Sequence, residues 1–263
     1  MTPAPTRLRQ AARRRLHAAR QARVPPLPQT TRHLLRACLA TPEDPRLDDW
    51  AGLGDIVTVL KDAEVQRAGL LALLLHAAEA TGVDLDPSLR SRLRAARLHA
   101  ELRLEMIGPA LRETLTEEAG VALRGIALAH TVYPHPALRH CHDLDLLTSH
   151  RADATVHPSG FPVSRHTSLF RTRHVGTREV ENNTVNAEIA GAGAQVLQPA
   201  DALVHVCAHA AARGRAQGLL WCVDVAMLLR SGVDLDRVHY TAKRWQVARP
   251  TARSLGYVRR LLG

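Results

Sequence analysis

The tripeptide Asp-Leu-Asp occurs three times in this chain, and paired carboxylates of this kind either cap helices or hold cations. The copies lie at residues 84–86, 143–145 and 234–236. The first and third copies follow Gly-Val and lead directly into segments with helical patterning, the first through Pro87. Asp86 and Asp236 are therefore predicted to lie at helix starts, where carboxylates accept hydrogen bonds from free backbone amides and carry a favourable charge.

The middle copy lies in a strand-like context. Asp143 and Asp145 precede Leu146-Leu147, and the alternation of a strand places both carboxylates on one face, with Leu144 and Leu146 on the other. Two like charges on one face repel each other and need a cation between them. Mg²⁺ is typically held by one or two carboxylates together with substrate phosphates, so this copy predicts a metal site.

A glycine turn precedes this copy by eighteen residues. Gly125 lies between a short β-like run at 121–123 and a helix-like run at 126–130. A turn from strand through glycine to helix lets backbone N–H groups approach a phosphate. The turn and the carboxylate pair together predict a site for a phosphate and its metal.

Residues 123–147 as a whole resemble the bacterial uncharacterised nucleotidyltransferase family of the polymerase-β-like superfamily. The family pattern is Leu-Lys-Gly, a short helix ending in Tyr-Pro, an Arg, and then Asp-Ile-Asp-Leu-Leu. The matching segments are Leu123-Arg124-Gly125, Tyr133-Pro134, Arg139 and Asp143-Leu144-Asp145-Leu146-Leu147. Segments at 197–205, 209–210 and 224–229 match the family's helical tail, so the resemblance covers roughly residues 30 to 262.

The resemblance implies an enzyme that binds an NTP, such as ATP, with two Mg²⁺ ions. An acceptor hydroxyl attacks the α-phosphorus and pyrophosphate leaves, while Asp143 and Asp145 bridge the metals. Arg124, Gly125 and Arg139 are the expected nucleotide-binding residues. The acceptor stays open between small molecules, peptides and RNA.

A third carboxylate from a neighbouring strand completes the metal site in that superfamily and helps to activate the nucleophile. The family's Val-Glu-Leu-His strand best matches Val180-Glu181-Asn182-Asn183. The resemblance therefore implies Glu181 as the third catalytic and metal-binding acid, ahead of Glu188 and Glu179.

The sequence also departs from the family pattern. Arg124 replaces the family's Lys, Ile126 follows the glycine where many members of the superfamily have Ser, and Asn183 replaces a His. These departures keep a second interpretation open, in which the chain is a catalytically degenerate binding protein. In that case its basic N-terminal arm holds a nucleic acid or an acidic partner.

Other clusters of reactive side chains have structural explanations. His140-Cys141-His142-Asp143 contains zinc-ligand types, but four consecutive residues cannot surround one ion without distant partners. His205 and His209 share a helix face without the acid of an HExxH motif, which favours helix packing. Four arginines fit the lining of a substrate cleft and a solvated β-face equally well: Arg165, Arg171, Arg173 and Arg178.

The elements that must position these residues indicate an α+β fold. A small mixed-sheet core over residues 119–198 is expected between helical regions at 29–118 and 199–263. Residues 1–28 are expected to form a flexible basic arm ending in prolines. Residues 1–42 hold nine arginines and no acid, whereas residues 43–263 carry 26 basic and 25 acidic side chains. The net charge of +10 therefore belongs to the arm and its vicinity, and not to the body.

Composition excludes several classes of protein. The chain has 263 residues, of which 46% are hydrophobic, and no apolar run reaches the roughly 20 residues of a membrane helix. Aromatic residues make up only 3%, too few for nucleic-acid binding mainly by base stacking. The four cysteines are scattered without a CxxC motif, as expected of a cytoplasmic protein without disulfides.

Overall fold

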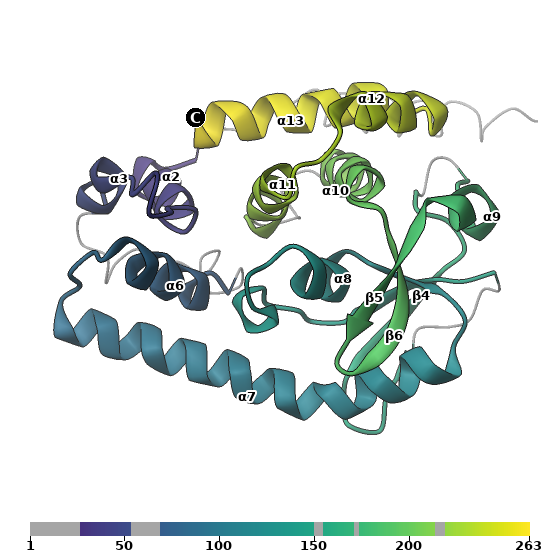
Figure 1. Ribbon diagram of the computed structural model, residues 1–263, viewed down its shortest axis with the longest axis horizontal. Helices are drawn as coiled ribbons and strands as arrows, with labels where there is room; N and C mark the ends of the chain where they lie inside the picture. Colours follow the sequence, from purple (N-terminus) through teal and green to yellow (C-terminus); the bar gives the residue numbers. More distant parts are fainter. Residues whose placement is uncertain (1–26, 54–68, 150–154, 171–173, 214–218) are drawn as a thin grey trace, which may run out of the picture.

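The computed structural model describes residues 27–53, 69–149, 155–170, 174–213 and 219–263. It confirms the α+β class, because a mixed six-stranded sheet lies among helices from both ends of the chain. The long helix α7 (Pro87–Glu117) runs along one side of the molecule, and α12 (Leu235–Arg244) and α13 (Ala248–Leu262) run along the opposite side (Figure 1). The basic arm lies outside the described residues except for its last two.

The N-terminal helical region contains α2 (Gln29–Ala37), α3 (Leu47–Ala51) and α6 (Leu71–Thr81) before α7. Helix α7 begins at the predicted residue. The Asp86 carboxylate accepts hydrogen bonds from the backbone amides of Ser88 and Leu89, and Pro87 occupies the first helical position. The first Asp-Leu-Asp copy is thus a helix cap, as predicted.

The sheet has the strand order β3-β4-β2-β1-β6-β5. Its strands are β1 (Val121–Leu123), β2 (Leu144–Leu147), β3 (Thr155–Val156), β4 (Pro162–His166), β5 (Thr184–Ile189) and β6 (Ala192–Leu197). Strand β2 is antiparallel to β1 and parallel to β4, so that Asp145 pairs with Leu123 on one side and with Ser164 on the other. The middle Asp-Leu-Asp copy therefore opens a central strand.

The two faces of this sheet contact different parts of the protein. Leu144 and Leu146 belong to a core with Leu111 of α7 and with α8 (Arg124–Thr131). Leu147 belongs to the other core, which includes α10 (Pro199–Arg213). Because side chains alternate along a strand, Asp145 projects on the same face as Leu147. This confirms the predicted facing of Asp145 and directs it toward the C-terminal helices.

The C-terminal region is helical, as expected, and also includes α11 (Leu220–Arg230). The prediction for the third Asp-Leu-Asp copy is wrong in its cap residue. Asp234, and not Asp236, accepts hydrogen bonds from the amides of Asp236 and Arg237. The cap of α12 is the first residue of its tripeptide, whereas the cap of α7 is the third residue and is followed by Pro87 in the first helical position.

The segment before β5 also differs from expectation. The resemblance matches residues 180–183 to a strand of the family, but α9 (Thr177–Val180) and the 3₁₀ turn η2 (Glu181–Asn183) precede β5. The Glu179 carboxylate accepts from the Gly176 amide, and the Asn183 side chain lies near the Glu179 carbonyl. Polar side chains that bond the local backbone in this way compete with strand pairing.

A short 3₁₀ turn, η1 (Pro136–Leu138), connects α8 to the approach to β2. All four cysteines lie within the described part of the chain, where they are buried and form no disulfide. None of the helices described there combines the length and the apolar character needed to cross a membrane.

Candidate functional site

Asp145 lies in a cluster of polar side chains beneath α10. It is only 6% exposed, and its Oδ1 atom lies 2.6 Å from Nη2 of Arg124 and 2.7 Å from Nε2 of His166. Burial raises its pKa, but the hydrogen bond from His166 and the charge of Arg124 outweigh burial and lower the pKa to about 2. Asp145 is therefore ionised at neutral pH, and Nε2 of His166 must carry the shared hydrogen.

Asp143 directly precedes β2 and is half-buried. Among the residues that the structure describes, no donor forms a hydrogen bond or an ion pair with its carboxylate. Burial raises the pKa of Asp143, and the nearby charge of Asp145 raises it further. The pair thus offers two hard oxygen donors, one without a partner, which fits the ligand chemistry of Mg²⁺.

Arg124 connects β1 to α8 and brings a cation to this pair. Its φ is +47°, in the left-handed region that residues other than glycine rarely adopt. Its Nη1 atom lies 2.5 Å from Nε2 of His209 on α10, opposite its contact with Asp145. Such a backbone costs on the order of 1–3 kcal/mol and persists only where surrounding contacts impose it. Contacts from α10 and β2 impose it here.

Arg139 has contacts different from those expected of a nucleotide-binding residue. Its guanidinium is buried, with Nη2 donating to Oδ2 of Asp224 at 2.8 Å and Nε donating to Oδ1 at 3.1 Å. The Tyr133 hydroxyl donates to the same carboxylate at 2.7 Å. Arg139 therefore connects the segment before the carboxylate pair to α11.

Gly125 is the neighbour that allows this arrangement. A Cβ atom at Gly125 would lie 2.7 Å from Nη1 of Arg139, closer than side chains normally approach. The described structure thus gives the glycine a packing role against Arg139. Its expected approach to a phosphate stays a prediction.

The third carboxylate stays a prediction, because the side chain of Glu181 lies outside the part of the protein that the structure describes. Glu181 lies in η2 and not in a strand, and Glu188 lies in β5, separated from β2 by β6 and β1. The strand beside β2 is β4, which carries Ser164 and His166 on the face of Asp145. No group of three metal-ligand side chains occurs among the described residues.

Two histidines of the site were not identified as site residues from the sequence. His166 bonds Asp145, and His209 contacts Arg124, although 21 and 85 residues separate these pairs. Eight of the fifteen histidines lie between residues 130 and 174, and His205 and His209 lie one helical turn apart. This clustering is the only sequence signal for them, and it does not specify which residues they contact.

The remaining clusters behave as structural elements where they are described. His140 and His142 pack ring against ring with centroids 4.3 Å apart, and burial first, then the charge of His142, lowers the pKa of His140 to about 4. Arg165 forms an ion pair with Glu118. Arg178 is exposed on α9, whereas residues 171–173 lie outside the described ranges.

Comparison with known proteins gives one family match. The family model for the uncharacterised nucleotidyltransferase matches residues 62–158 and 152–263, two overlapping segments that together span most of the chain. No curated protein and no solved structure matches the chain.

Proposed function

The chain belongs to the uncharacterised nucleotidyltransferase family, and we propose that it transfers an NMP from an NTP to an acceptor hydroxyl in a Mg²⁺-dependent reaction. The observation that carries this proposal is the position of the carboxylate pair. Asp143 directly precedes β2 and Asp145 lies in it. The cross-strand partner of Asp145 is Leu123, which is followed by Arg124 at the N-terminus of α8. The side chains proposed to hold the metal ion and the phosphates thus lie close together, which supports the proposal.

The proposed reaction exchanges one bond at the α-phosphorus for another. The acceptor oxygen bonds to the α-phosphorus, the bond from that phosphorus to the bridging oxygen of the β-phosphate breaks, and pyrophosphate leaves with its electron pair. The acceptor proton passes to a carboxylate or to solvent. Asp143 and Asp145 would hold the Mg²⁺, which would supply positive charge to stabilise the attacking and leaving oxygens.

Arg124 has donors to spare for a phosphate. A guanidinium carries five N–H bonds, and its two terminal nitrogens bond Asp145 and His209. Its Nε–H group is buried and has no hydrogen-bond partner in the described part of the protein. Arg124 therefore orients the triphosphate in this proposal. Glu181 as a third ligand, and a second metal ion, remain predictions.

One observation favours a second candidate function. The strand beside the pair presents His166 to Asp145 where the superfamily pattern calls for a carboxylate. A site with two carboxylates and a histidine would suit a degenerate member that binds a partner without transfer. In that case the basic arm at residues 1–28 supplies a salt-dependent contact with nucleic acid or an acidic protein.

The two candidates are separated by following the α-phosphate. The full chain is incubated with each α-labelled NTP, Mg²⁺ and a cell extract, and the label is traced to a product. Transfer that EDTA abolishes and that the Asp143→Asn variant lacks supports the enzyme. Absence of transfer with all four NTPs, together with RNA binding that survives Asp143→Asn and weakens steeply with salt, supports the binding protein.

A further inference from the structure

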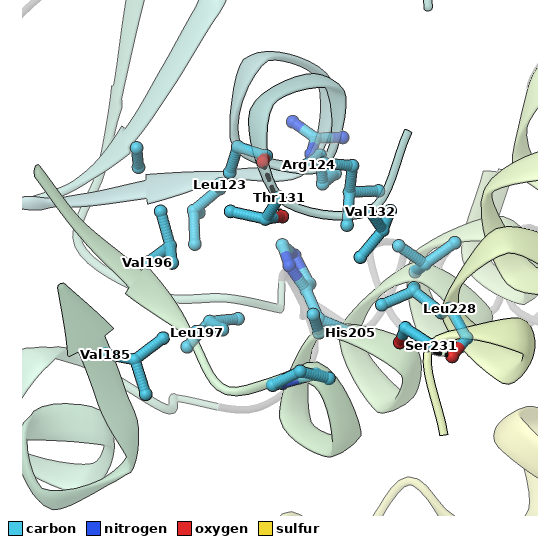
Figure 2. Close-up of a pocket in the computed structure, with 16 residues that line it drawn as sticks. Leu123, Arg124, Thr131, Val132, Val185, Val196, Leu197, His205, Leu228 and Ser231 are labelled. Carbon is cyan, nitrogen blue, oxygen red and sulfur yellow. Dashed lines mark hydrogen bonds between the residues drawn. The ribbon is translucent and has the colours of Figure 1, made fainter. Parts of the chain in front are cut away.

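A cavity of about 260 Å³ lies next to the carboxylate pair, where α8, α10 and α11 meet the ends of β1, β5 and β6 (Figure 2). Arg124 lines the cavity and also bonds Asp145. Leu123 lines it as well and is the cross-strand partner of Asp145. A ligand in the cavity would therefore have one end beside the candidate metal site.

The walls of the cavity are chiefly aliphatic. Twelve of its sixteen lining residues are Ala, Leu, Val or Pro, and none is Phe, Tyr or Trp. The hydroxyls of Thr131 and Ser231 donate within their own helices, to the carbonyls of Ala127 and Leu228. Such walls suit an uncharged group and lack the Phe, Tyr or Trp side chains on which a nucleobase would stack best.

His205 is the exception in these walls. It is only 2% exposed, and its ring projects from α10 toward Thr131 in the cavity (Figure 2). Its neighbours Phe170 and His209 make ring contacts, with centroids at 5.8 and 6.1 Å, but no described residue forms a hydrogen bond with it. A polar ring in the wall of a cavity, without a hydrogen bond to a side chain, is satisfied by a ligand or by water.

The electrostatic surroundings keep His205 neutral. Burial lowers its pKa well below the ordinary value, and the positive charge of Arg124 lowers it further. A neutral imidazole has one donor and one acceptor nitrogen. The cavity can therefore satisfy one hydroxyl or amide group on an otherwise apolar ligand.

We propose that this cavity binds the acceptor substrate, and that the acceptor carries an uncharged aliphatic group with one hydrogen-bonding function that meets His205. The role of this ligand as the acceptor rests on the proposed transferase function, whereas the binding of an uncharged aliphatic group in the cavity does not. The absence of Phe, Tyr and Trp from the walls argues against the nucleobase of the NTP as the occupant, and the charge of Arg124 argues against a cationic ligand.

The test measures binding and not turnover. The ¹⁵N-labelled full chain is titrated with cyclohexanol, with cyclohexylammonium and with adenosine, while the His205 imidazole signals are followed by NMR. Cyclohexanol is expected to shift these signals saturably, with a dissociation constant of about 1–10 mM for so small a probe. Cyclohexylammonium, which has the same ring but a charge, is expected to bind at least about tenfold more weakly.

Two valines on opposite edge strands provide a matched pair of variants. Val185 in β5 lines the cavity and is 41% exposed, whereas Val156 in β3 is 66% exposed at the other edge of the sheet. Val185→Trp is expected to weaken cyclohexanol binding about tenfold by filling the cavity mouth. Val156→Trp is expected to leave it unchanged.

Three results would overturn the proposal: no shift at His205 with cyclohexanol, equal losses in the two valine variants, or binding of adenosine in place of cyclohexanol. The last would reassign the cavity to the nucleobase. Cyclohexanol binding in a chain that transfers no label would refute the transferase function and leave the ligand chemistry of the cavity standing. Label transfer without cyclohexanol binding would refute the cavity proposal alone.

Discussion

The middle Asp-Leu-Asp copy and the two outer copies have identical sequences, but their carboxylates bond distant side chains in the first case and nearby backbone amides in the second. Asp86 and Asp234 each accept hydrogen bonds from backbone amides two and three residues ahead, at 2.9 and 3.2 Å. Asp145 is bonded by Arg124 and His166, each 21 residues away along the chain. The tripeptide is a local capping device where a helix follows it and a tertiary site where a strand follows it.

The largest expected difference between the copies is in catalysis. Asp143→Asn and Asp145→Asn remove a negative charge from the proposed metal site and should each lower NMP transfer by roughly 10³-fold. Asp86→Asn and Asp234→Asn make the same chemical change at helix caps and should leave transfer within about twofold. Rates of label transfer at saturating Mg²⁺ measure all four. Similar losses in all four variants would mean that the copies do not differ in function.

The two carboxylates of the middle copy should also differ from each other in stability. The pKa of Asp145 is lowered to about 2, so its charge stabilises the folded protein at pH 7 by about 2 kcal/mol. Asp145→Asn should lose about that free energy of unfolding. The pKa of Asp143 is raised, so its charge opposes folding, and Asp143→Asn should be as stable as the parent or slightly more stable.

The pH dependence gives the sign of each effect. A lowered pKa contributes stability above the unfolded value, so the deficit of Asp145→Asn should shrink as the pH falls from about 4 toward about 2. For Asp143 the raised pKa means that stability is lost as the pH rises through its folded value, so any gain in Asp143→Asn should disappear in acid. Urea unfolding in EDTA at several pH values measures both, and a stability loss in Asp143→Asn would show that its charge is structural.

A smaller effect is expected at the turn that supports the middle copy. Alanine is favoured over glycine in helices by up to about 1 kcal/mol, so Gly125→Ala would ordinarily stabilise α8. Because the new Cβ meets Nη1 of Arg139 at 2.7 Å, we expect a net loss of roughly 1–2 kcal/mol. Gly193→Ala in β6, where nothing lies within 4 Å of the new Cβ, is the control and should be as stable as the parent or slightly more stable in thermal unfolding. Equal stability of the two variants would show that the Arg139 side chain moves aside without a cost in free energy.

The smallest effects belong to the outer copies. Asp86→Asn and Asp234→Asn should change the free energy of unfolding by only a few tenths of a kcal/mol, since asparagine caps a helix about as well as aspartate. Asp86→Ala and Asp234→Ala should each cost about 1 kcal/mol. Asp236→Ala should cost less than Asp234→Ala, because Asp236 lies inside α12 and caps nothing. A larger loss at Asp236 would reverse the assignment of the cap.

Local patterns in the sequence determined the helix starting at Pro87, the strands at 121–123 and 144–147, and the facing of Asp145 away from Leu144 and Leu146. Each of these depends on residues within a few positions of one another, where hydrogen bonding and side-chain alternation act directly. The family match supports the general nucleotidyltransferase assignment that the motif at 123–147 indicated.

Tertiary structure alone decided what surrounds the pair. Alternation along β2 does not specify its neighbour, and the pairing of β4 beside it brings His166 to Asp145. Likewise Arg139 finds its partner Asp224 at a separation of 85 residues, in a buried ion pair that the sequence did not predict. Such contacts form only when the chain closes and packs, because no periodicity within a segment encodes the distant segment that will lie beside it.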